Sequence, residues 1–193
     1  MKHRLLMLVP ALALAAACGQ SAGTAESAAT PISPSAVPSS GAQAVRTDVR
    51  VTMMDACDPE TFSAVLGPGG CVRSGGVTFD DFIAQLTKQG SIGAWRFAPG
   101  VARVQVGQTF DAVNRGGEAH TFTEVAEFGG GIVPDLNRLS GVPNVAPECT
   151  ALEPDDFVAP GATYHEEVEH TGALKFQCCI HPWMRLEAQA TSR

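Results

Sequence analysis

Residues 174–185 read LKFQCCIHPWMR, and this stretch decides how the rest of the chain is interpreted. It carries a thiol, an imidazole and a thioether at Cys178, His181 and Met184. Sulfur and imidazole ligands together favour copper or zinc over magnesium, calcium or manganese. One cysteine, two histidines and a weak axial methionine form the ligand set of blue-copper electron-transfer sites. The stretch contains one histidine, so the second must come from elsewhere in the chain.

His120 is the natural candidate for the second histidine. It follows the Gly116-Gly117 turn and begins a predicted strand over 120–125. His165 lies among charged residues and His170 precedes a Thr-Gly turn, so we expect both to be solvated.

Two adjacent cysteines compete for the ligand position. Alternation along a predicted strand over 173–178 places Leu174, Phe176 and Cys178 on the inward face. Cys179 then points away and is available for another bond. It is expected to form a disulfide, but it could also stay free or join Cys178 as a second sulfur ligand.

The surrounding sequence predicts short strands separated by Gly and Pro turns, which indicates a β-sandwich. One helix is expected over 77–88, because Thr78 can cap it and Phe79, Phe82, Ile83 and Leu86 form an apolar stripe. Residues 128–160 form a long insertion that contains Gly and Pro, with a possible short helix over 135–139. The strands are predicted at 94–98, 101–106, 109–114, 120–125, 162–168, 173–178 and 187–191.

These features resemble the cupredoxin family, and within it the amicyanin-like and plastocyanin-like proteins. The resemblance covers about residues 94–193 and includes FAP at 97–99, VQVGQT at 104–109 and Asn114 six residues before His120. Its most specific part is CCIHPWM at 178–184, which is similar to the short C-x-x-H-P-x-M loop of amicyanin. Residues 48–93, the insertion and Cys179 depart from the minimal family pattern.

The resemblance implies an all-β, cupredoxin-like Greek-key sandwich with one N-terminal helix and a long loop insertion. It implies one type 1 copper ion as cofactor, and it implies that Asn114 links the two ligand loops by hydrogen bonds. Trp183 would cover the metal, and His181 would present an edge to solvent as the electron port. The implied copper ligands are His120, Cys178, His181 and Met184.

The other cysteines of the domain are expected to form two disulfides. If Cys178 binds copper and the N-terminal cysteine is modified, four cysteines remain. Cys57 and Cys71 are close in sequence, and closing a loop of ~15 residues contributes on the order of 3 kcal/mol. Cys149 and Cys179 would then join the insertion to the copper loop.

The N-terminus is expected to direct export. Residues 1–17 combine a basic start with a short apolar run, which is typical of a signal peptide. The stop before Cys18 resembles a bacterial lipobox, so Cys18 is expected to be lipidated; ordinary cleavage near Ala17 is the alternative. Residues 18–47 are rich in Ala, Ser and Pro and predict a flexible tether. Residues 48–193 would form the domain, at a periplasmic or extracellular membrane surface.

The formal net charge of −7 argues against a nucleic-acid binder and is compatible with a redox partner that has a basic surface. The leading hypothesis is a monomeric, exported one-electron carrier rather than an enzyme. Two rivals remain: a copper trafficking or sequestration protein, and a metal-free binding module on the same fold.

Overall fold

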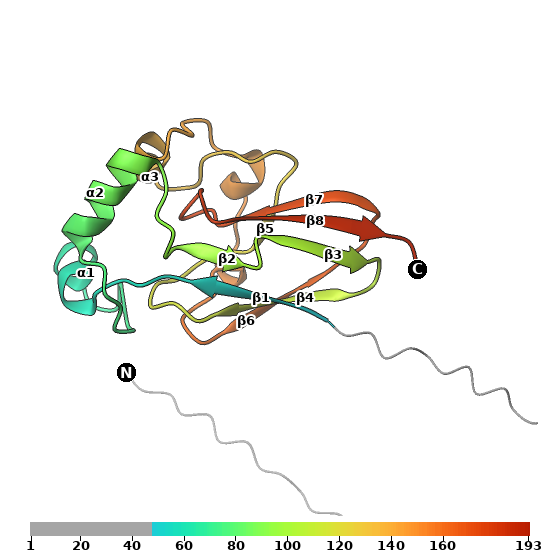
Figure 1. Cartoon of the computed structure of the whole chain (residues 1–193), viewed down its shortest axis with the longest axis horizontal. Helices are drawn as coiled ribbons and strands as arrows, with labels where there is room; N and C mark the ends of the chain where they lie inside the picture. The colour runs from blue at the N-terminus through green and yellow to red at the C-terminus, as the bar shows by residue number, and fades with distance from the viewer. Residues whose placement is uncertain (1–47) are drawn as a thin grey trace, which may run out of the picture. The chain divides into compact units, whose positions relative to one another are not determined.

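Within residues 48–193 the strands form two four-stranded sheets, with orders β2-β1-β4-β6 and β3-β8-β7-β5 (Figure 1). The computed structural model describes residues 48–193, so the predicted signal peptide, the tether and Cys18 lie outside the described residues. Within them the strands are β1 Val49–Met54, β2 Arg96–Ala98, β3 Val101–Gln105, β4 Thr109–Asn114, β5 Thr123–Glu124, β6 Thr163–Glu167, β7 Gly172–Gln177 and β8 Arg185–Thr191.

The core lies between the two sheets. Alternate residues of β3 and β8 are buried, as a half-exposed strand requires. The ring of Phe176 in β7 stacks on Phe122 at 4.5 Å and meets Phe110 of β4 edge-on at 5.1 Å. These contacts join the sheets, and the predicted all-β sandwich is confirmed.

The first strand belongs to the sandwich itself. β1 pairs antiparallel with β2 and parallel with β4, so it occupies the interior of its sheet. Residues 48–93 were expected to depart from the minimal fold, but the structure shows that their first part completes one sheet. The parallel pairing also brings the ends of β1 and β4 to the same edge.

Between residue 48 and β2 there are two helices rather than the single one predicted: α1 Pro59–Leu66 and α2 Phe79–Gln89. The α2 helix is confirmed, with Thr78 as N-cap and Gly90 in the left-handed conformation at its end. Asp58 is the N-cap of α1, and its carboxylate accepts a hydrogen bond from the Thr61 amide. Pro59 is the first residue of the helix. Both helices lie beyond one end of the sheets (Figure 1).

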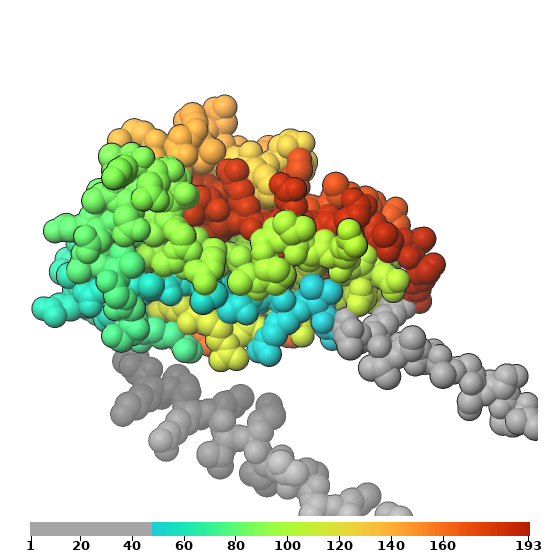
Figure 2. Space-filling model, viewed as in Figure 1, coloured from blue at the N-terminus to red at the C-terminus, as the bar shows by residue number. Residues whose placement is uncertain are grey.

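The insertion 128–160 contains α3 Pro134–Leu139 and two short 3₁₀ turns, Pro147–Thr150 and Pro154–Asp156. It lies against both α2 and the C-terminal strands (Figure 2). The Ile132 amide donates to the Cys179 carbonyl at 2.7 Å, which fixes the insertion beside the loop after β7. Among residues 48–193, no helix has the length and apolar character needed to cross a membrane.

The strand predicted over 120–125 is shorter than expected, because β5 covers only Thr123–Glu124. His120 instead forms an isolated bridge with Val158, in which each amide donates to the other residue's carbonyl. His120 is therefore held by the end of the insertion rather than by a neighbouring strand.

Candidate metal centre

Three potential metal ligands converge in the interior at one end of the sandwich. The Nδ1 atoms of His120 and His181 each lie 3.8 Å from Cys178 Sγ. One ligand atom from each of the three side chains lies within 4.8 Å of the others. His120 and Cys178 are fully buried, and His181 is 2% exposed. The structure thus brings together three of the four predicted ligands around one point.

The fourth predicted ligand, Met184, is fully buried and ends the same loop. The loop closes on itself because the Cys178 amide donates to the Met184 carbonyl at 3.0 Å. The Met184 amide in turn donates to the His181 carbonyl at 2.9 Å. These backbone bonds hold the ends of the 178–184 loop together.

The choice of Cys178 over Cys179 agrees with the structure. Leu174, Phe176 and Cys178 are all buried on the inward face of β7 and its extension. Cys179 forms a disulfide with Cys149, so it is neither free nor a second sulfur ligand.

The second predicted disulfide, Cys57–Cys71, is also present. Within residues 48–193, the thiol of Cys178 is the one that remains unbridged.

The spacing of the three ligand atoms fits one metal ion. Metal–sulfur and metal–imidazole bonds of about 2.3 and 2.0 Å, at angles between tetrahedral and trigonal, separate sulfur from nitrogen by roughly 3.5–3.8 Å. The two observed separations of 3.8 Å lie at the trigonal limit of this range. A buried thiol facing two imidazoles is also the soft donor set that copper accepts.

The site favours a charged sulfur. Burial alone would raise the pKa of the Cys178 thiol, but hydrogen bonds from His120 and His181 and their charges hold it well below its usual value. Burial would lower the pKa of His120, yet hydrogen bonds to Asp55 and Cys178 raise it to about 9. Without metal, both shifts therefore favour a thiolate beside a protonated imidazole.

Asp55 was not predicted, and it orients His120. Its carboxylate lies 3.0 Å from His120 Nε2, on the opposite side of the ring from Cys178. Asp55 follows β1, and the parallel pairing with β4 places it beside the turn that leads to His120. Burial raises the pKa of Asp55, but hydrogen bonds from His120, Gly117 and Glu118 outweigh burial and lower it. A carboxylate at this position fixes the tautomer of a ligating histidine.

The two glycines before His120 allow this close approach. A Cβ atom at Gly116 would collide with the Asp55 carboxylate, and one at Gly117 would collide with Cys57 Sγ. Because Gly117 lacks a side chain, its amide donates to both Asp55 oxygens at 2.9 Å. The Gly116-Gly117 turn therefore positions the Asp55 carboxylate, and this carboxylate orients His120.

The link between the ligand loops is made by Thr121 rather than by Asn114. The Asn114 amide donates to the carbonyls of Glu118 and Val158, and its oxygen accepts from Gly116. These bonds join the His120 loop to the insertion, which corrects the predicted role of Asn114.

Thr121 contacts both residues of the cysteine pair. Its amide donates to Cys178 Sγ at 3.4 Å, and its hydroxyl accepts from the Cys179 amide at 2.8 Å. Nothing in the local sequence pattern singled out this threonine, because its role depends on the distant loop after β7.

His181 does not present an edge to solvent, so the predicted electron port is wrong in this respect. Its ring meets Phe82 of α2 at 6.5 Å and Trp183 at 5.5 Å between centroids. Its Nε2 lies 3.6 Å from the carboxylate of Glu118, which is itself 7% exposed. Phe82 of α2, Trp183 and Glu118 therefore cover the imidazole that was expected at the surface.

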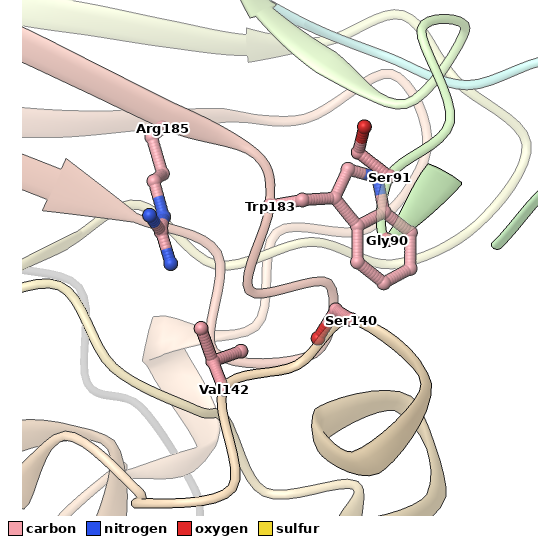
Figure 3. A pocket seen from close by; sticks show the side chains of 6 residues that line it. All are labelled: Gly90, Ser91, Ser140, Val142, Trp183 and Arg185. Carbon is pink, nitrogen blue, oxygen red and sulfur yellow. The ribbon is translucent and has the colours of Figure 1, made fainter. Parts of the chain in front are cut away.

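The Trp183 ring meets the His181 ring edge-on at 5.5 Å between centroids, and Trp183 also borders a pocket. Figure 3 shows this pocket, with the side chains of Trp183 and Arg185 on either side of it. Arg185 Nε donates to the Pro182 carbonyl at 2.8 Å, and its guanidinium lies 4.8 Å above the Phe128 ring. The lining residues are Gly90, Ser91, Ser140, Val142, Trp183 and Arg185.

The two remaining described histidines lie on the surface, as expected. The side chain of His165 is 66% exposed and pairs with Asp111, and that of His170 is 63% exposed near Glu124. Neither belongs to the buried cluster.

Comparison with known proteins gives structural similarities at low identity. No family model and no curated protein matches the chain. A purple cupredoxin from Nitrosopumilus maritimus is similar over 75% of this chain and 100% of its own, with 13% identity and a TM-score of 0.42. An amicyanin variant in the Cu(I) form covers 50% of this chain and 73% of its own, with 17% identity and a TM-score of 0.35. The oxidised plastocyanin of Dryopteris crassirhizoma covers 50% and 89%, with 16% identity and a TM-score of 0.34.

Proposed function

We propose that the chain is an exported, cupredoxin-like protein that binds one type 1 copper ion and carries single electrons. The proposed ligands are His120, Cys178, His181 and Met184. The observation that carries the proposal is the buried thiol of Cys178 with an imidazole nitrogen 3.8 Å away on each of two sides. A bound copper ion would supply a one-electron couple at this point.

The residues around the ligands support a carrier because they restrict movement. Asp55 fixes the His120 ring, Thr121 joins the two ligand loops, and the Cys149–Cys179 disulfide anchors the residue next to Cys178. A site held in this way changes little between two oxidation states, so little reorganisation accompanies electron transfer. Burial also excludes water from the thiolate.

The proposal includes a redox partner with a basic surface and no catalytic function of the chain's own. The acidic formal charge of −7 favours a partner of the opposite sign. Because Phe82, Trp183 and Glu118 cover His181, the partner would dock against the residues that cover this imidazole.

Redox cycling separates the proposed carrier from a copper trafficking protein with the same ligands. The copper-loaded chain is reduced and reoxidised repeatedly in the presence of a Cu(I) chelator, and the metal content is measured after each cycle. A carrier keeps its copper and its reversible couple. Transfer of Cu(I) to the chelator in the first cycles would contradict the proposal and favour trafficking.

A metal-free binding module is the other rival. It predicts that only substoichiometric copper is bound, without an intense visible thiolate-to-copper band. Binding of one copper ion per chain, lost when Cys178 is replaced, would exclude this module.

Export and lipidation of Cys18 are part of the same proposal. Intact-mass measurement of the protein from its native membrane fraction tests them. A diacylglyceryl modification on Cys18 supports a lipoprotein, whereas an unmodified N-terminus near residue 18 contradicts the lipid anchor and leaves export in place.

A further inference from the structure

An apolar pocket of about 300 Å³ lies between α1, α2 and α3, next to the ligand cluster. Its walls are the side chains of Phe62, Leu66, Phe79, Ile83, Leu136 and Leu139. Glu118 and His181 also line it, so two polar groups meet an otherwise hydrophobic surface. A pocket with apolar walls and a few convergent polar groups is the usual form of a small-molecule site.

Glu118 is the unusual member of this lining. Its side chain is 9% exposed, and its Oε2 accepts from Trp95 Nε1 at 2.6 Å. Within residues 48–193, no hydrogen bond to the second oxygen, Oε1, accompanies this one. Among residues 48–193, Oε1 is not one of the fully enclosed side-chain atoms that lack a partner, so it keeps contact with solvent and can still accept a hydrogen bond. The structure therefore leaves one strong acceptor available beside an apolar pocket.

The walls favour an aromatic occupant. Phe62 meets Phe79 edge-on at 5.3 Å and Phe82 edge-on at 5.5 Å, so the pocket borders a cluster of rings. Rings of this kind attract a further ring in the same edge-to-face or offset arrangements. An apolar cavity of about 150 Å³ is enough for benzene, so about 300 Å³ accommodates one or two rings.

We propose that this pocket binds a small aromatic molecule that carries one hydrogen-bond donor, a hydroxyl or an amino group. The ring lies among the phenylalanine and leucine side chains, and the donor bonds Glu118 Oε1. This binding does not depend on copper, although an occupant would lie beside His181. If the proposed function also holds, the occupant controls access to the covered ligand.

The probes are p-cresol, which has a ring and a hydroxyl, and toluene, which has the same shape without the donor. They are titrated into the full-length chain, in the Cu(I)-loaded and the metal-free forms, and methyl NMR signals are followed. We expect saturable shifts of the Leu66, Ile83 and Leu139 methyls and none at Val101, which is 74% exposed elsewhere. A charged hydrogen bond corresponds to about tenfold or more tighter binding of p-cresol than of toluene.

Two pocket-filling variants test the location. Leu136→Trp and Ile83→Phe each place a ring in the cavity, and both should abolish saturable p-cresol binding while Val101→Ala binds as the unchanged chain does. Far-ultraviolet circular dichroism shows whether each variant is folded. Unchanged p-cresol binding in a folded pocket-filling variant would overturn the proposal.

The probe comparison adds two further outcomes that overturn it. They are equal affinity for toluene and p-cresol, and the absence of saturable shifts for both probes. Because the metal-free chain is tested as well, these failures are distinguishable from failure of the copper proposal, which is measured on the metal.

Discussion

Two regions around the metal centre contribute to it in different ways. The loop 178–184 supplies three of the four proposed ligands within seven residues, and its backbone bonds close it locally. Residues 55–95 supply no proposed ligand, but they provide the carboxylate of Asp55, the cover of Phe82 and the indole of Trp95 that binds Glu118.

The two regions therefore control different properties of the centre: one controls which metal ion binds, and the other controls the surroundings of the ligands. The loop determines which ions are accepted, because ligand type and spacing lie within it. The N-terminal region determines orientation, protonation and solvent access, because its side chains touch the ligands from outside. Changes in the first region should therefore remove the site, and changes in the second should modify it.

The largest effect is expected from removing the loop's thiol. Cys178→Ala should abolish the visible thiolate-to-copper band and stoichiometric copper binding, because no other unbridged thiol lies among residues 48–193. The matched sulfur change in the other region is Cys57→Ala with Cys71→Ala. That double variant should lose about 3 kcal/mol of stability and keep the band. If the double variant lost the band while Cys178→Ala kept it, the roles assigned to the two regions would be wrong.

Copper affinity should depend steeply on pH below about 9, the pKa of His120 in the metal-free chain. Below this value the imidazole holds a proton on the nitrogen that faces Cys178, and metal must displace it. Affinity should therefore fall about tenfold for each pH unit from 9 towards 7, and about 100-fold in total. Competition titrations at several pH values measure this slope. A flat profile between pH 7 and 9 would contradict the assigned role of His120.

Asp55→Asn should lower copper affinity by about 10–100-fold while keeping the visible band. The variant keeps a hydrogen-bond acceptor but removes the charge that supports His120. Without this charge the pKa of His120 falls. Copper affinity should therefore become independent of pH at a lower pH than in the unchanged chain. Equal affinity with an unchanged profile would show that the N-terminal region does not tune the ligand.

Thr121→Val should lower the free energy of unfolding by about 1–3 kcal/mol, because the buried Cys179 amide loses its acceptor. The change preserves shape, so the ligands stay in place and the band shifts only slightly. Chemical denaturation measures the first effect and absorption the second. Loss of copper binding would mean that the loops depend on this contact for the site itself.

The smallest effect is expected at His165. His165→Ala should leave copper affinity and the visible spectrum unchanged, since its side chain is 66% exposed and outside the cluster. Stability should stay within about 0.5 kcal/mol. A change in metal binding would indicate that His165 acts as a ligand, although it lies outside the buried cluster.

The sequence was most informative where the residues of the site are neighbours. Cys178, His181 and Met184 share one loop, and strand alternation together with the spacing to His181 distinguished Cys178 from Cys179. His120 was predicted as a ligand from the Gly-rich turn before it and its position at the start of a predicted strand, although that strand proved shorter. The sandwich was predictable because short alternating segments between Gly and Pro turns repeat along the chain.

What sequence reasoning missed depends on long-range packing. Asp55 reaches His120 because β1 and β4 pair in parallel, and no local sequence pattern predicts that pairing. Thr121 reaches Cys179 because β5 and β7 are paired neighbours in one sheet. Phe82 was predicted as a core residue, and its contact with His181 depends on how α2 packs. The α1 helix did have a signal, since Asp58 and Pro59 form a good helix start.

The most direct test of the central claim is the absorption spectrum of the full-length chain loaded with one equivalent of Cu(II). A type 1 site predicts an intense visible thiolate-to-copper band, with narrow copper hyperfine splitting in the paramagnetic resonance spectrum of the same sample. A colourless copper complex, or a chain that prefers Zn(II) in direct competition, would contradict the assignment.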